Sequence, residues 1–154
     1  MTMTITKIKE NVQALLVATD YFVTVLPGAP EQESDFAGYP SASHYYTTTD
    51  NAYATVSQNR RIIEYVIDMY IVAPAAVSLA DEYSRAYTLI DNVIDMLDKT
   101  IDLSEGLGVT IGLTEACDIM RPAPGNLMRV TTGEGDGLML SIRLFCESDV
   151  SFRS

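Results

Sequence analysis

The sequence predicts an α+β fold, in which a mainly antiparallel β-sheet carries two amphipathic helices packed on one face. Two neighbouring segments support this prediction. In residues 61–72, every second residue from Ile63 onward is apolar, and the residues between them are mixed apolar and acidic. We call each set of alternate residues a parity. This alternation is typical of a half-buried strand. The apolar parity comprises Ile63, Tyr65, Ile67, Met69 and Ile71. From Ser78 the spacing becomes that of a helix with one apolar stripe, which comprises Leu79, Tyr83, Ala86, Tyr87, Ile90, Val93, Ile94 and Leu97.

The chain before this pair predicts a first helix, a short strand and a long loop. A helix is expected at residues 4–19, because its apolar residues fall on one face. A strand at residues 21–26 would stop at Pro27 and Gly28. Residues 27–39 are rich in Pro, Gly, Glu, Ser and Asp, which indicates a loop without a core of its own. Long loops of this kind are often functional.

The segment after this loop leaves two arrangements open. Residues 39–49 favour β-structure through their aromatic side chains and threonines. A turn at Asp50 and Asn51 would bring the chain back before the long strand begins near Arg60. Alternatively, the whole segment projects from the sheet as an arm. In both cases we expect a protruding loop or arm around residues 27–58.

The region after the second helix is expected to contain an edge strand and then an irregular section. The helix should end near Lys99, a favourable charge for a helix C-terminus. Glycines at residues 106–113 predict a weak edge strand. Pro122 and Pro124 indicate an irregular section.

A β-hairpin is expected near the end of the chain. Two strand patterns, residues 127–131 and 138–146, flank a Gly/Asp turn at residues 133–137. A phosphate loop would need a Lys-Ser/Thr pair and a following helix, and an EF-hand would need a different spacing of acids, so neither site is predicted here. One parity of the second strand is apolar, and it comprises Leu138, Leu140, Ile142, Leu144 and Cys146.

Composition predicts one domain spanning residues 1–154. A chain of 154 residues that is 47% hydrophobic can bury a single core. The 21 acidic residues outnumber the 10 basic ones, and the net charge of −11 argues against a protein that grips nucleic acid. No signal-peptide pattern opens the chain, and no apolar run approaches the roughly 20 residues of a membrane span. We therefore expect no membrane partner.

No arrangement of residues predicts catalysis. The lone histidine, His44, has no carboxylate close in sequence to orient it, so we expect a surface or interface histidine. The two cysteines do not predict a disulfide framework. Cys146 is expected in the core and Cys117 could be exposed, but a catalytic Cys117 would need His44 as its partner. We expect no enzyme, no cofactor and no metal.

Two further patterns suggest surfaces that contact other subunits or partners. Asp91, Asp95, Asp98 and Asp102 recur every three or four residues on one side of the second helix. This side is either a solvated face or an acidic wall that faces a lumen or a basic partner. Tyrosine is frequent, and these side chains either pack within turns and strands or, if exposed on a flexible segment, are typical of interfaces. We expect subunit or partner contacts from Tyr39, His44, Tyr45, Tyr46 and Tyr53.

The order of elements resembles that of tail terminator proteins of long-tailed bacteriophages. Tyr39-Pro40-Ser41, Asn59-Arg60-Arg61 before the long strand and the helix from Asp81 to Asp98 contribute to the resemblance, which covers most of the chain. The resemblance implies a virion protein of the tail and neck, assembled in the host cytoplasm. Another neck component, a tail-completion or head-closure protein, is a similar match.

The resemblance also implies an assembly. A homohexameric ring would cap the tail tube, end its polymerisation and join it to the head-side connector. DNA would pass through without specific binding, and an acidic wall that includes Asp91, Asp95 and Asp98 would suit such a channel. A closed ring needs a heterologous interface, which an arm reaching a neighbour supplies.

Two functions of other classes remain open at this point. A small acidic intracellular enzyme would assemble its site from distant residues. A DNA-mimic inhibitor would space carboxylates like phosphates over one surface. The single histidine and the absence of a phosphate or metal motif weigh against the enzyme. The long loop and the tyrosines that follow it favour an assembly protein over the mimic.

Overall fold

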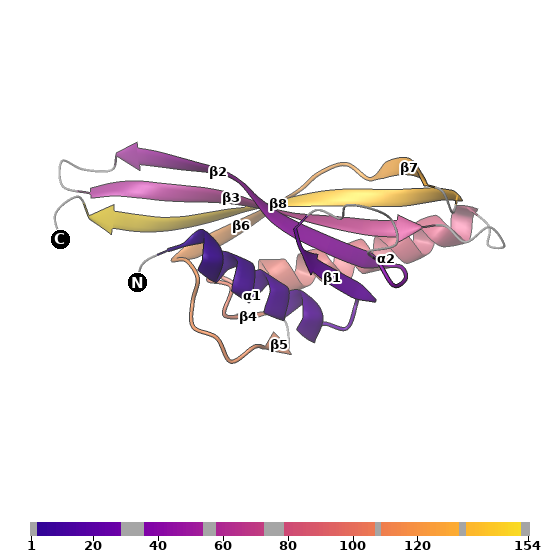
Figure 1. Ribbon diagram of the computed structural model, residues 1–154, viewed down its shortest axis with the longest axis horizontal. Helices are drawn as coiled ribbons and strands as arrows, with labels where there is room; N and C mark the ends of the chain where they lie inside the picture. The colour runs from indigo at the N-terminus through magenta and orange to yellow at the C-terminus, as the bar shows by residue number, and fades with distance from the viewer. Residues whose placement is uncertain are drawn as a thin grey trace.

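A computed structural model describes residues 3–28, 36–53, 58–72, 79–106, 109–132 and 135–151. Within these residues a six-stranded sheet carries two helices on one face (Figure 1), as predicted. The elements are α1 (Ile5–Ala18), β1 (Thr24–Pro27), β2 (Ser41–Tyr53), β3 (Gln58–Val72), α2 (Leu79–Asp98), β4 (Glu105–Gly106), β5 (Val109–Thr110), β6 (Ile119–Pro124), β7 (Met128–Thr132) and β8 (Gly135–Ser151). Ser78, the expected start of the second helix, lies outside the described residues.

The main sheet has the order β1-β2-β3-β8-β6, and β7 also pairs with β8. β1 runs parallel to β2, and the other described pairings are antiparallel. Both β6 and β7 can use the same edge of β8 because the chain bends at Gly125, whose N–H donates to the Ser141 carbonyl at 2.8 Å. A Cβ at this glycine would lie 3.0 Å from that oxygen. The hairpin of β7 and β8 confirms the expected strand pair.

The core lies between the sheet and the helices. The apolar parities predicted for β3 and β8 are both buried there, with none of their ten side chains more than 7% exposed. The helices cover them with Ile8, Val12, Leu15 and Leu16 of α1 and with Val93, Met96 and Leu97 of α2. Burying one such side chain contributes about 1.5–3 kcal/mol, so this layer dominates the stability of the fold.

β2 differs from the prediction at its outer end. The expected turn at Asp50 and Asn51 is wrong, because β2 continues through both and pairs with β3 as far as Tyr53. β3 begins early enough to supply a ladder partner for each of these residues, and the ladder bonds outweigh the turn preference of the Asp-Asn pair. One irregularity interrupts the pairing between Tyr46 and Thr48.

Two predictions for residues 106–124 are also wrong. The expected edge strand at 106–113 is replaced by the short strands β4 and β5, which form a separate two-stranded sheet. The section around Pro122 and Pro124 is not irregular but belongs to β6, which pairs with β8. Proline is compatible with this place because an edge strand does not use every backbone N–H in the ladder.

Two residues that the sequence did not assign to the core are buried. Phe36, at the end of the predicted loop, is 8% exposed and its ring lies 5.0 Å from the ring of Tyr70. Cys117 is fully buried, because its segment is fixed to α1. The side-chain amide of Asn11 donates to the carbonyls of Leu103 and Thr114 at 3.1 and 2.8 Å. The expected burial of the other cysteine, in β8, is confirmed.

Candidate interaction surfaces

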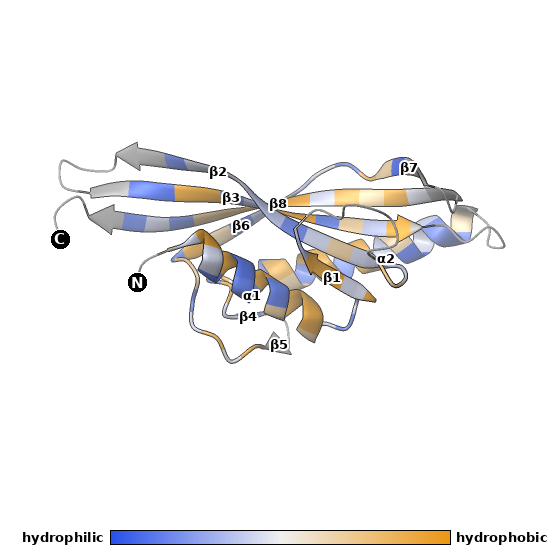
Figure 2. Cartoon of the chain, viewed as in Figure 1, coloured by the Kyte–Doolittle hydropathy of each residue, from blue (hydrophilic) through white to orange (hydrophobic). Residues whose placement is uncertain are grey.

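The ends of β2, β3 and β8 extend past α1 as a three-stranded arm (Figure 1). We define the arm as residues 48–53, 58–62 and 147–151. Continuous antiparallel pairing joins the three segments, from Asp50↔Ile62↔Glu147 outward. Figure 2 shows more hydrophilic residues on β8 toward the arm than on its half near α2. The hairpin of β2 and β3 therefore extends from the sheet together with β8, which was not expected to take part.

A charged network crosses the arm. Arg60 donates from Nε and Nη2 to Oε2 of Glu147 at 3.1 and 2.9 Å, and from Nη1 to Asp149 at 3.2 Å. Arg121 of β6 lies 3.7 Å from the same Glu147 oxygen. The hydrogen bond to Glu147, together with the charge of its carboxylate, raises the pKa of Arg60. The network joins β3, β8 and β6 where the apolar core ends.

The predicted interface tyrosines have different surroundings. Tyr46 is 39% exposed and its hydroxyl lies 2.7 Å from that of Thr49, at the base of the arm. Tyr39 is half-buried beside Phe36, with 6.1 Å between the rings. The side chain of Tyr53 lies outside the described residues. Of these three, Tyr46 offers the most accessible described side chain for a contact.

Tyr45 belongs to a hydroxyl and carboxylate cluster on the sheet face away from the helices. Its hydroxyl donates to Oδ2 of the buried Asp68 at 2.9 Å, and Ser141 donates to Oδ1. Burial, followed by the hydrogen bond and charge of Asp68, raises the pKa of Tyr45 to about 12. The cluster links β2, β3 and β8. The sequence placed Asp68 on the mixed parity but did not indicate which hydroxyls face it.

The expectation of a surface or interface histidine is wrong, because His44 is completely buried. Gln13 of α1 donates its amide to the Val25 carbonyl, which turns Oε1 toward the imidazole. His44 therefore donates from Nε2 to Gln13 and accepts at Nδ1 from the Tyr65 hydroxyl, both at 2.6 Å. Burial, and then the charge of Lys9, lowers its pKa to about 4. His44 is a neutral residue that connects α1 to the sheet.

The acidic side of α2 is exposed. Asp91, Asp95 and Asp98 are all exposed, and Asp95 lies 3.9 Å from the ammonium of Lys99. Asp102 does not continue the row, because it lies past the helix and accepts from the backbone N–H and hydroxyl of Ser104 at 3.0 and 2.5 Å. Solvent exposure of the first three agrees with either interpretation made from the sequence.

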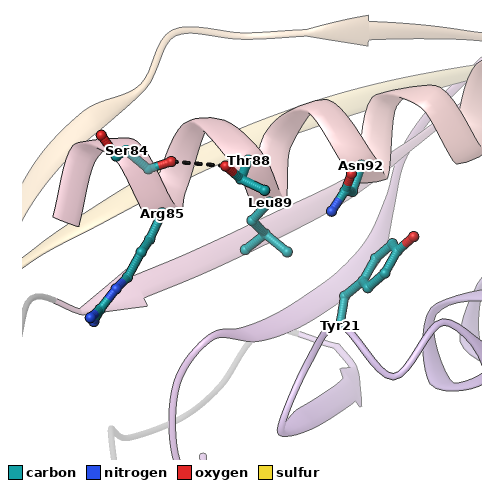
Figure 3. A pocket seen from close by; sticks show the side chains of 6 residues that line it. All are labelled: Tyr21, Ser84, Arg85, Thr88, Leu89 and Asn92. Carbon is teal, nitrogen blue, oxygen red and sulfur yellow. Dashed lines mark hydrogen bonds between the residues drawn. The ribbon is translucent and has the colours of Figure 1, made fainter. Parts of the chain in front are cut away.

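Two open grooves lie beside the helices. One, of about 390 Å³, is lined by Tyr21 of the loop before β1 and by Ser84, Arg85, Thr88, Leu89 and Asn92 of α2 (Figure 3). The Thr88 hydroxyl donates to the Ser84 carbonyl, so it is satisfied within the helix. The other, of about 500 Å³ and mostly apolar, runs along α1 between Lys9 and Val17 and ends at Pro27 and Leu113. Neither of these two grooves combines a hydroxyl or thiol nucleophile with a histidine or carboxylate base in its described lining.

Comparison with known proteins adds no relative. No protein-family model matches the sequence, and no curated protein matches it either. Among the described residues, no helix combines the length and apolar character needed to cross a membrane. Across the same part of the chain, no group of three or more His, Cys, Asp or Glu side chains is placed to hold a metal ion.

Proposed function

We propose that this chain is a structural protein of a bacteriophage neck, a tail terminator that caps the tail tube as a six-membered ring. The ring ends polymerisation of the tube and joins it to the head-side connector in the virion. The proposal rests on the resemblance in element order and on one structural observation, the arm. An arm that reaches beyond its own helix-covered body and lies against the body of a neighbouring subunit supplies the heterologous contact that a closed ring requires.

The acidic face of α2 gives this ring a channel wall. Exposed carboxylates repel phosphate, so a channel lined by Asp91, Asp95 and Asp98 lets DNA pass without binding it. A tail-completion or head-closure protein would use the same arm and the same acidic face. The tail tube protein and the head connector are the partners on the two sides of the ring.

The test is solution mass across protein concentration, by light scattering behind a sizing column, followed by negative-stain imaging. Rings of about six subunits with a hole as wide as duplex DNA support the proposal. Shortening β2 and β3 within the arm should abolish the rings and leave the helical signal in far-ultraviolet circular dichroism unchanged. Particles without a central hole at every concentration count against it.

A further inference from the structure

One edge of β2 has no described strand beside it over most of its length. β1 covers β2 only from Ser41 to His44, and the last contact is the Gly28 N–H on the His44 carbonyl at 2.7 Å. From residue 45 to residue 53, β2 pairs with β3 on one side alone within the described chain. We call this stretch, residues 45–53, the free margin of β2. Unpaired backbone groups along such a margin are a template for another strand.

The opposite margin of the arm, along β8, is closed as far as Asp149. Beyond the last β6 pair, Asp118 caps β8: its N–H donates to the Glu147 carbonyl at 3.0 Å, and its carboxylate accepts from the Asp149 N–H at 3.2 Å. The charged side chains of Asp149 and Arg60 also lie here. Charges and side-chain caps of this kind prevent pairing between sheet edges. A head-to-tail contact between the β2 margin of one copy and the β8 margin of another is therefore disfavoured.

The free margin of β2 lacks such protection over its described side chains. Thr47, Thr48 and Thr49 are exposed, neutral residues with high β-propensity. Asp50 is the one charged residue among residues 45–53. The irregularity near Thr47 bends one end of the margin and leaves the rest of it regularly paired with β3.

We propose that the free margin of β2 pairs antiparallel with the same margin of a second copy of this chain. Such a contact is isologous, so one surface serves both copies and no second complementary surface is needed. The margin is bounded by the end of β1 and by the end of β2 at Tyr53, and its midpoint is Thr49. A two-fold axis at Thr49 places Thr48 opposite Asp50 of the partner subunit, a hydroxyl facing a carboxylate. The two sheets become one continuous sheet.

Charge makes the pairing salt-dependent in a defined direction. Each copy carries a net charge of −11, and Asp50 of both copies lies near the contact. The repulsion is screened as ionic strength rises, because the Debye length falls from about 30 Å at 0.01 M to about 8 Å at 0.15 M. Dimer formation should therefore strengthen with added sodium chloride, opposite to a contact held by ion pairs.

The test is disulfide crosslinking of Thr49→Cys by copper phenanthroline in air. The native Cys117 and Cys146 are buried and do not compete. Self-crosslinking of Thr49→Cys should be roughly tenfold faster than that of Ser84→Cys, an exposed control on α2, because residues opposite each other across a pair approach disulfide distance. When Thr48→Cys and Asp50→Cys are mixed, the two variants should crosslink to each other faster than either variant crosslinks to itself.

Thr49→Lys separates this pairing from the ring. Lysine on an edge blocks strand addition, so the variant should lose the salt-strengthened dimer in light scattering and keep the circular dichroism of the native protein. The result does not depend on the proposed neck function, since dimers without rings support the pairing and contradict only the ring. Two results would overturn the inference. One is equal crosslinking rates for Thr49→Cys and Ser84→Cys. The other is a solution mass of Thr49→Lys that equals that of the native chain at every salt concentration.

Discussion

The arm is built from the ends of three strands that also run through the helix-covered body of the sheet, but the two regions are stabilised differently. Over the helices, β3 and β8 direct Ile67 and Ile142 into a core that excludes solvent completely. In the arm, Arg60 of β3 pairs across the ladder with Glu147 and Asp149 of β8. Hydrophobic burial fixes the body, whereas backbone pairing and charge fix the arm. Changes in the arm should therefore alter contacts with other molecules more than they alter folding.

The largest expected effect is loss of a core side chain in the body. Ile67→Ala should lower the free energy of unfolding by about 2–5 kcal/mol, because it removes buried apolar surface and leaves a cavity. Ile62→Ala is a matched control on the same strand within the arm, where the side chain is half-buried. Its loss should be less than half as large. Urea unfolding followed by circular dichroism measures both, and equal losses would contradict the division into body and arm.

The next largest effect is a pH dependence of the stability of the folded chain, caused by the titration of His44. Its pKa is about 4 in the folded chain against about 6.5 in the unfolded one, so the unfolded state binds the proton more readily between these values. The contribution of neutral His44 to the free energy of unfolding is therefore fully present near pH 7, and it is lost as pH decreases through this window. Between pH 7 and pH 4.5 the histidine should account for about 2–3 kcal/mol.

The measurement is the urea midpoint of the native chain and of His44→Gln at pH 7 and at pH 4.5. The variant removes the titrating group while the carboxylates remain, so the difference between the two pH dependences isolates His44. The native chain should lose more stability than the variant does on acidification. Equal losses of stability in the native chain and in His44→Gln would show that His44 has the same pKa in the folded and unfolded states.

A smaller effect separates a half-buried hydroxyl that binds a buried carboxylate from an exposed hydroxyl in the arm. Ser141→Ala should cost about 1–3 kcal/mol, because it leaves Oδ1 of the buried Asp68 without its donor. Thr49→Ala removes a hydroxyl contact with Tyr46 at the base of the arm, where water can replace it, and should change stability by no more than about 0.5 kcal/mol. A reversed order of the two losses in urea unfolding would contradict the burial of this cluster.

The sequence predicts the body better than the arm, for a physical reason. Period-two and helical spacing record which side chains face a core, so the apolar parities of β3 and β8 and both helices are confirmed. The arm has no such core. Its length depends on ladder partners far along the chain, and the Asp50-Asn51 pair looked like a turn because local preference cannot register a long β3 opposite.

The surface residues follow the same rule. Exposure of Asp91, Asp95 and Asp98 could be predicted because their spacing places them together on one side of α2, outside its apolar stripe. The burial of His44 could not, since it depends on Gln13 and Tyr65, which lie 31 and 21 residues away. Cys117 is a similar case, held inward by a loop that Asn11 attaches to α1.

The smallest expected effect is on the acidic face of α2. Replacing Asp91, Asp95 and Asp98 together with Asn should change the free energy of unfolding by no more than about 0.5 kcal/mol per site, because exposed charges gain little from folding. Asp102→Asn is the matched control, since its carboxylate holds the Ser104 N–H and hydroxyl and its loss should cost about 1 kcal/mol. A face that contributes nothing to stability is free to line a channel or meet a basic partner. A loss of several kcal/mol in the triple variant would instead assign these aspartates to the fold and remove the proposed channel wall.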